Sequence, residues 1–265
     1  MSHSLPYTVN CSLLFTELPL HERPAAARRA GFDAVEFWWP FESPVPPAAE
    51  VDAFIFAIDT AGVSLTGLNF YAGALPGPDR GVLSQPDRAH HFHDSIDVVV
   101  DIAERTGARS FNALYGLRQD GIDPTEQDRV ALESVLAAAK AVKAVGGTVL
   151  IEPISGAGDY PLTTASEGLA FVAKAQAAGA PNVALLADFF HLAVNGDDVA
   201  AVVGDHAAEF GHIQIADVPG RGEPGTGELP IDDLLTAAQA GGYSGHVGLE
   251  YKPTVPSADS FGWRG

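Results

Sequence analysis

The chain has 265 residues, of which 46 % are hydrophobic and 18 % are charged, so it can bury a substantial core and is not typical of a disordered protein. Its formal net charge is −19, from 34 acidic and 15 basic residues, which argues against a nucleic-acid-binding protein because such proteins need a basic surface. No apolar segment reaches the roughly 18 residues that a membrane span requires.

The single cysteine and the N-terminal segment both bear on the cellular location of the protein. Cys11 has no second cysteine to pair with, which fits a reducing environment, and we expect it to be a small buried hydrophobe. The segment MSHSLPYTVN lacks a charged stretch followed by a long apolar run, so we expect no signal peptide. These features predict a cytoplasmic protein without membrane or nucleic-acid partners.

Short apolar segments recur along the chain and predict strands. Most are nearly continuous apolar runs, which is typical of strands buried on both faces of a parallel sheet. We expect strands at residues 7–14, 34–37, 63–69, 109–113, 148–151, 183–187, 212–216 and 245–249.

Helices are predicted between these strands, and many are followed directly by glycine, the residue that supplies a left-handed helix end. We expect helices at residues 20–30, 48–61, 87–106, 124–145, 164–178, 197–210 and 231–240. This order predicts one α/β domain, residues 1–265, folded as a (β/α)8 TIM barrel with a short or missing eighth helix. An open doubly wound sheet is the competing fold, but the first strand is not followed by G-x-G-x-x-G.

Polar residues lie at or near the carboxyl ends of four consecutive predicted strands, the fifth to the eighth. Any one of them alone is typical of a helix cap or an ion pair. In a TIM barrel, however, the carboxyl ends of the strands meet at one rim, where the catalytic groups of such enzymes lie. Oxygens buried there need a counter-charge, and a divalent cation is the simplest one. All-oxygen ligation indicates Mg²⁺ or Mn²⁺, and the predicted ligands are Glu152, Asp188, Gln214 and Glu250.

Two of these ligands, Glu152 and Glu250, lie well apart around the predicted ring and are the candidate catalytic residues. Two carboxylates on opposite sides of a metal-bound substrate form an acid–base pair, in which one removes a proton from carbon and the other returns it to the neighbouring carbon. This enediolate chemistry is that of an aldose–ketose isomerase or an epimerase. A hydrolase would need an activated nucleophile, and the sequence has no G-x-S-x-G motif.

Further polar residues near the same rim predict substrate contacts. Glu36 and Asn69 lie at the ends of the second and third strands. His191 follows the sixth strand, although it is equally typical of a buried core histidine. The segment 212–228, HIQIADVPGRGEPGTGE, contains a charged loop stiffened by proline, and its Arg221 is suited to hold a carboxylate.

Two other groups of residues are ambiguous in the sequence. The cluster His90, His91, His93 and Asp94 looks like a metal site, but it opens a predicted helix, and we interpret it as a solvated helix start. Four aromatic residues are typical of either a core or a pocket wall: Trp38, Trp39, Phe189 and Phe190.

Several segments that carry these residues resemble hydroxypyruvate isomerases and their close relatives, within the wider xylose-isomerase-like barrels of sugar isomerases and epimerases. The most specific segments are GFDAVEFWWP, LIEPI, LLADFFH, GHIQIADVPGRGEPGTGE and VGLEYKP. The resemblance implies one metal ion on Glu152, Asp188, Gln214 and Glu250, with the two glutamates as the proton-transferring pair. Gln214 stands where the wider superfamily commonly has His, and Gln there marks the hydroxypyruvate isomerase branch.

The resemblance implies interconversion of hydroxypyruvate and 2-hydroxy-3-oxopropanoate (tartronate semialdehyde). The substrate would be a small hydroxy or oxo acid, and Arg221 and Lys252 are the cations suited to its carboxylate. The loop 71–86 differs from that of the branch, so a 2-oxo-tetronate or a small ketose is an alternative substrate.

Two distant alternatives are an apurinic endonuclease-like phosphodiesterase and a non-catalytic sugar-acid-binding barrel. The first needs further His ligands and a basic face, and the second would be expected to have lost one glutamate. Exposed aromatic residues leave a homo-oligomer open.

Overall fold

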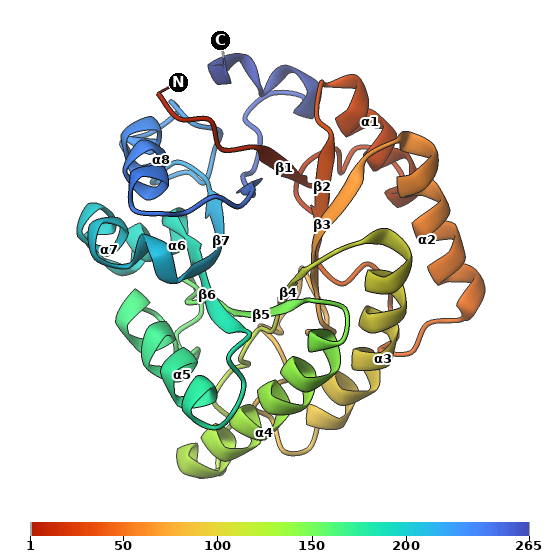
Figure 1. Cartoon of the computed structure of the whole chain (residues 1–265), viewed down its shortest axis with the longest axis vertical. Coiled ribbons are helices and arrows are strands. Elements are labelled where there is room, and N and C mark those ends of the chain that lie inside the picture. Colours follow the sequence, from red (N-terminus) through yellow and green to blue (C-terminus); the bar gives the residue numbers. More distant parts are fainter. Residues whose placement is uncertain (1, 265) are drawn as a thin grey trace.

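The computed structural model describes residues 2–264 and shows eight strands closed into a barrel, with neighbours in chain order and every pair parallel (Figure 1). This is the predicted TIM barrel. The strands are β1 (Tyr7–Asn10), β2 (Ala34–Phe37), β3 (Ser64–Asn69), β4 (Ser110–Asn112), β5 (Thr148–Ile151), β6 (Val183–Asp188), β7 (Phe210–Ile215) and β8 (Val247–Leu249).

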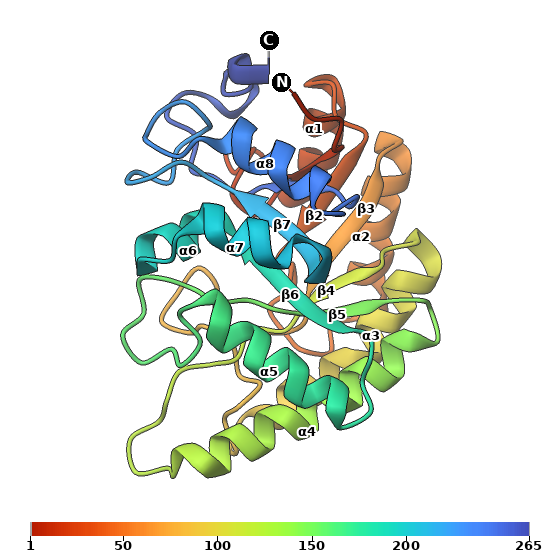
Figure 2. The ribbon, with the colours of Figure 1, turned by 60° about the vertical axis from the view of Figure 1, so that its left-hand side comes forward.

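Helices surround the barrel and cover its outer face, as Figures 1 and 2 show. Left-handed glycines end several of them as predicted, for example Gly62 with φ +66° and Gly107 with φ +83°. Among the described residues no helix is long and apolar enough to cross a membrane. The helices are α1 (Arg23–Arg29), α2 (Ala48–Ala61), α3 (Ala89–Thr106), α4 (Pro124–Lys143), α5 (Ala165–Ala177), α6 (Phe189–Asn195), α7 (Val199–His206) and α8 (Ile231–Ala240).

Between β6 and β7 the structure has two α-helices where one, at residues 197–210, was predicted: α7 lies within the predicted range, and α6 was missed. Asp188, at the end of β6, accepts a hydrogen bond from the backbone N–H of Phe190, so α6 starts at once. Asp198 caps α7 separately. Gly211 does not end a helix but lies inside β7, where a Cβ would come within 2.6 Å of the Leu150 side chain. The first strand also ends earlier than predicted, because Leu14 N–H turns back to the carbonyl of Asn10.

The eighth helix of the ideal barrel is replaced, as expected, by short 3₁₀ turns. Within residues 2–264, β8 is followed by Ser257–Asp259 and Gly262–Arg264 and by no α-helix. Phe261 between them packs against Phe32 at a ring-centroid distance of 4.6 Å. The tail therefore covers the barrel beside α1, and the two chain ends lie close together (Figure 1).

Loops that follow the strands gather on one side of the barrel, as Figure 2 shows for those after β3, β4, β5 and β7. This is the rim at which the sequence predicts the site, because the side chains at the carboxyl ends of parallel strands point into the same space.

Candidate active site

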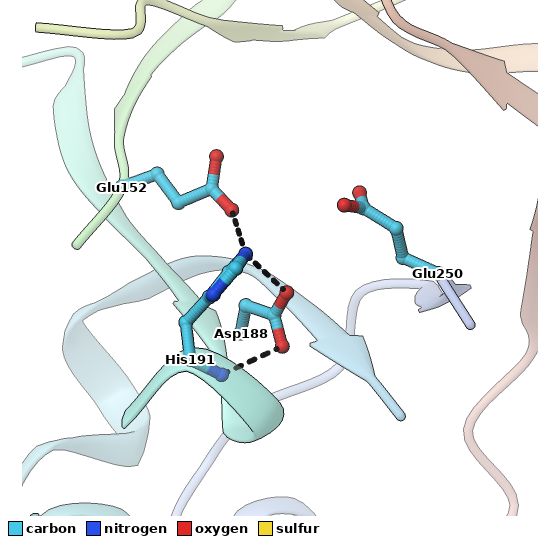
Figure 3. A group of neighbouring side chains, drawn as sticks. All are labelled: Glu152, Asp188, His191 and Glu250. Carbon is cyan, nitrogen blue, oxygen red and sulfur yellow. Dashed lines mark hydrogen bonds and ion pairs between the residues drawn. The ribbon is translucent and has the colours of Figure 1, made fainter. Parts of the chain in front are cut away.

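Three carboxylates and one imidazole converge at this rim. Glu152 directly follows β5, Asp188 ends β6, Glu250 directly follows β8, and His191 lies in the first turn of α6. One ligand atom from each lies within 4.8 Å of the others, and all four residues are buried. Figure 3 shows the two glutamates entering from different sides, with Asp188 and His191 between them. The structure thus brings together the three carboxylates that the sequence singled out.

Gln214 stands beside Asp188, its register partner on β7. Its amide nitrogen donates to Glu36 Oε1 at 2.7 Å, which directs the amide oxygen away from Glu36. That oxygen and Asp188 Oδ2 are buried and have no hydrogen-bond partner among the described residues. Buried acceptors without partners are costly, and two on neighbouring strands indicate a site completed by a cation.

The charge of the cluster gives the same indication. Burial, followed by the charge of Asp188, raises the pKa of Glu152 to about 8. Burial also raises the pKa of Glu250 well above its usual value, although the charge of Arg221 opposes this shift. Burial is the main cause of both shifts, and the cation beside the cluster, Arg221, does not outweigh it. The oxygen-only donor set fits a divalent cation.

Two asparagines that the sequence reasoning missed orient the glutamates. Asn112 Nδ2 donates to Glu152 Oε2 at 2.6 Å, and Asn10 Nδ2 donates to Glu250 Oε2 at 2.9 Å. Asn112 and Asn10 are the last residues of β4 and β1. The strand-end signal that identified the ligands was therefore present for both. Glu152 Oε1 is left facing His191 at 4.0 Å.

His191 is held as a neutral hydrogen-bond donor. Its Nδ1 accepts the backbone N–H of Ser155 at 3.0 Å, so in the neutral ring the proton lies on Nε2. Burial lowers the pKa of His191 to about 4, which keeps the ring neutral near pH 7. Nε2 lies 3.5 Å from Asp188 Oδ2. His191 therefore presents an N–H group beside the carboxylates rather than a lone pair for a metal.

Arg221 is positioned by the loop at residues 217–228, which is held together by hydrogen bonds to the side chain of Asp217. Asp217 accepts backbone N–H groups from four positions of this region, among them Gly225 at 2.9 Å and Gly227 at 2.8 Å. Arg221 itself has a left-handed φ of +58°, a strained conformation that is common at functional sites. Its guanidinium lies 5.2 Å over the ring of Phe190 and donates to Glu250 Oε1 at 2.5 Å.

Glu36 lies deeper than the sequence indicated. Its carboxylate accepts from Gln214, from Asn10 at 3.2 Å and from His212 at 2.7 Å, all inside the barrel. Gly248 leaves room for it, since a Cβ there would come within 2.6 Å of Glu36 Oε1. Glu36 does not line the cavity above the site. We therefore assign it to the orientation of Gln214, in place of the direct substrate contact predicted from its strand-end position.

A cavity of about 260 Å³ lies above the carboxylates. Trp38 is part of its wall, whereas Phe189 is fully buried in the core and Phe190 supports Arg221. Trp39 packs on Phe41 and Tyr71. The polar residues that line the cavity include Asn69, Arg80, Ser155, His191, Arg221 and Lys252.

The histidine cluster at the start of α3 and Cys11 both lie outside the site, as predicted. His90, His93 and Asp94 are exposed in the first turns of α3, and His93 bonds to Ser134, so the cluster is a solvated helix start as predicted. Cys11 is buried, and burial raises the pKa of its thiol.

Comparison with known proteins gives concordant matches. A sequence model of the family described as xylose isomerase-like TIM barrel matches residues 24–263. A Streptomyces coelicolor protein, provisionally named a hydroxypyruvate isomerase, is 52 % identical over 97 % of this chain and 94 % of its own length. A 2-oxo-tetronate isomerase of Cupriavidus necator is 33 % identical over 97 % of this chain and 96 % of its own. The crystal structure of a family 2 AP endonuclease from Brucella melitensis is 27 % identical, with a TM-score of 0.88 and 98 % of both chains covered.

Proposed function

We propose that this chain, which belongs to the xylose isomerase-like TIM barrel family and is an isomerase like its hydroxypyruvate and 2-oxo-tetronate isomerase relatives, interconverts hydroxypyruvate and 2-hydroxy-3-oxopropanoate. The observation that carries the proposal is the pair of buried glutamates, Glu152 and Glu250, beside Asp188 and the unpartnered oxygen of Gln214. Such a set holds one substrate between two proton-transferring groups.

The cofactor in this proposal is one Mg²⁺ or Mn²⁺ ion, held by Glu152, Asp188, Gln214 and Glu250. Their donor atoms are all oxygens, as these ions prefer. When bound, the ion polarises the substrate carbonyl and stabilises the negative charge that develops on its oxygen. Burial raises the pKa of both glutamates, and a bound ion would supply positive charge to their carboxylates.

Proton transfer is assigned to the two glutamates in sequence. Among residues 2–264 Glu152 Oε1 has no hydrogen-bond partner, while both oxygens of Glu250 accept hydrogen bonds, from Arg221 and Asn10. We therefore assign removal of the proton from carbon 3 of hydroxypyruvate to ionised Glu152, and delivery of a proton to carbon 2 to Glu250 in its protonated form, which its raised pKa favours. After each turnover Glu152 releases its proton to solvent and Glu250 takes one up, so that the pair is reset. The hydroxyl proton on oxygen 3 moves to oxygen 2, so that the ketone becomes a hydroxyl and the hydroxymethyl group becomes an aldehyde. The Nε2–H of His191 lies beside these oxygens as a donor.

The substrate class follows from the cations at the cavity. Arg221 and Lys252 line it, and both suit a carboxylate-bearing hydroxy or oxo acid. Asn69 in the cavity wall offers an amide to substrate hydroxyls. A 2-oxo-tetronate, one carbon longer, is the second candidate, since the Cupriavidus necator relative is named for that substrate. The single buried cysteine supports a cytoplasmic location.

Proton NMR of the protein with hydroxypyruvate in D₂O tests the proposal. It is run with Mg²⁺ or Mn²⁺, with a chelator, and with Glu152→Gln. We expect metal-dependent formation of the semialdehyde that the variant loses, by roughly 100- to 10,000-fold in kcat.

The other outcomes of this experiment separate the alternatives. Deuterium entering the substrate without net isomerisation would leave the proton transfer standing and favour the longer 2-oxo-tetronate. Neither exchange nor product with any metal would overturn the assignment, and the site would then be a metal-binding or sugar-acid-binding one.

A further inference from the structure

The loop after β3, residues 71–86, extends over the cavity and contributes Arg80 to its wall. Its anchoring is extensive. Gly81 N–H donates to the Ala72 carbonyl at 3.0 Å, and Ser84 N–H donates to the Tyr115 carbonyl at 2.9 Å. The carbonyl of Arg80 accepts from Gly116 N–H at 3.0 Å. The backbone that carries Arg80 is therefore fixed against the loop after β4.

Gly81 shows how closely the two loops pack. It has a left-handed φ of +101°, and a Cβ at this position would come within 2.0 Å of the Leu114 carbonyl oxygen. Asp79 closes the other end of the turn, because its carboxylate accepts from Ala74 N–H at 2.8 Å and pairs with Arg88 at 2.7 Å. Arg80 thus lies between two residues whose positions are fixed by hydrogen bonds, Asp79 and Gly81.

The guanidinium of Arg80 is held by backbone and not by a carboxylate. Its Nη1 donates to the carbonyls of Gly77 and Asp79, at 2.6 Å each. Within residues 2–264 it forms no ion pair, since Asp79 is engaged by Arg88. Nη2 and Nε thus stay available for a planar acceptor.

The other two cations of the cavity are less suited to an incoming anion. Arg221 is already paired with Glu250 and lies 3.6 Å from Asp188, so its charge is compensated inside the site. Lys252 is exposed, and water screens its charge.

The pairing of the cavity cations supports a role for Arg80. Arg221 is paired with Glu250, whereas Arg80 has no carboxylate partner among residues 2–264. An anionic substrate gives Arg80 such a partner, whereas a neutral ketose does not. We propose that Arg80 binds the carboxylate of the substrate and makes the site selective for oxo and hydroxy acids over neutral sugars of the same length. This inference rests on the proposed function and deepens it.

Paired ligands that differ only in the carboxylate test it. Hydroxypyruvate and dihydroxyacetone form one pair, in which a hydroxymethyl group replaces the carboxylate. Glycerate and glycerol form a second, unreactive pair for titration calorimetry on the metal-loaded protein. In Arg80→Gln we expect KM for hydroxypyruvate to rise and glycerate affinity to fall, each by roughly 10- to 100-fold. Deuterium exchange into dihydroxyacetone and the binding of glycerol should stay at the wild-type level.

Two further variants locate the effect. Asp79→Asn breaks the ion pair with Arg88 and loosens the same loop, without touching the cavity and without leaving a free carboxylate beside Arg80, and we expect it to leave the preference for glycerate over glycerol unchanged. If Asp79→Asn reproduces the effect of Arg80→Gln, loop order and not the charge is responsible, and the proposal fails. It also fails if Lys252→Gln abolishes glycerate binding while Arg80→Gln does not.

The calorimetric arm separates this inference from the proposed function. Absence of any isomerisation, together with glycerate binding that depends on Arg80, would overturn the proposed reaction and leave Arg80 as an anion-binding residue. Isomerisation of hydroxypyruvate with an unchanged KM in Arg80→Gln would overturn the role of Arg80 alone. A wild-type protein that binds no glycerate would overturn it as well.

Discussion

The two halves of the barrel rim differ in what their strands present. β5 to β8 end in acceptor oxygens; Asp188 Oδ2 and Gln214 Oε1, like Asn112 Oδ1 on β4, have no hydrogen-bond partner among residues 2–264. β1 to β4 end mainly in amides, and these orient the acceptors of the other half. The rim residues of the first half are Asn10, Glu36, Asn69 and Asn112, and those of the second half are Glu152, Asp188, Gln214 and Glu250.

The contacts between the halves are specific. Asn112 donates a hydrogen bond to Glu152, and Asn10 donates one to Glu250. Glu36 accepts a hydrogen bond from the amide of Gln214. In the proposed function, residues at the ends of β5 to β8 are the catalytic and metal-binding groups, and residues at the ends of β1 to β4 orient them. Partners of this kind commonly change metal affinity or activity by about 10- to 100-fold. Loss of a ligand should therefore cost more than loss of its partner.

The largest effect is expected for Asp188→Asn. The amide keeps an oxygen to cap α6, but it loses the charge that an ion needs. We expect the affinity for Mn²⁺, followed by calorimetry or electron paramagnetic resonance, to fall by more than the roughly 100-fold that partner residues reach. Asp198→Asn at the cap of α7 is the matched control and should bind Mn²⁺ normally. Unchanged affinity in Asp188→Asn would remove Asp188 from the ligand set.

A smaller effect is expected for Asn112→Ala in the orienting half. Glu152 loses a 2.6 Å hydrogen bond and its fixed orientation, so kcat should fall by about 10- to 100-fold. Steady-state kinetics measure this loss. Asn182→Ala removes an asparagine that makes two partly buried hydrogen bonds at the other end of the strands, and serves as the control for stability. Equal losses of kcat in both variants would refute an orienting role for Asn112.

Glu36→Gln should weaken Mn²⁺ binding by about tenfold, at the lower end of the same range. The side-chain amide of a glutamine at position 36 can donate a hydrogen bond as well as accept one. The Gln214 amide can then turn over, so that its oxygen is no longer directed away from residue 36. Calorimetry in a Gln214→His background sharpens the test, because an imidazole has no amide to reverse. If Glu36→Gln weakens binding equally in both backgrounds, Glu36 acts in another way.

The smallest effect is a pH dependence of stability without metal. Glu152 has a pKa of about 8 in the folded protein and 4.5 when unperturbed, so between about pH 6.5 and 8 the folded state binds more protons than the unfolded chain. Stability therefore falls as pH rises through this window. Below pH 6.5 the lowered pKa of His191 acts in the opposite sense, since the unfolded chain then binds the extra proton.

Thermal unfolding of chelator-treated protein measures this dependence. For a chain of this size, 1 kcal/mol moves Tm by roughly 2–4 °C. Mn²⁺ should raise Tm more at pH 8 than at pH 6.5, because ligands bind the ion in the deprotonated state. A metal-induced rise that is independent of pH would contradict the raised carboxyl pKa values. Glu152→Gln should reduce the pH dependence.

Much of the fold could be predicted from local patterns. The apolar runs and the glycines behind the helices identified all eight strands and the order of the barrel. Prediction failed where a glycine served packing, as Gly211 does in β7, and where a carboxylate served as a cap, as Asp188 does for α6. A glycine that ends a helix and a glycine that allows close packing look the same in the sequence. Only the contacts with the neighbouring strand distinguish them.

By itself, the sequence determined which strand ends carry acceptors, because that depends only on the order of residues along each strand. The contacts across the rim were decided by the tertiary structure. Asn10 meets Glu250, 240 positions away, and Glu36 meets Gln214, 178 positions away. Arg80 faces the cavity because its loop is anchored on the loop after β4. Closing the barrel creates these neighbours, and no pattern within a single segment records them.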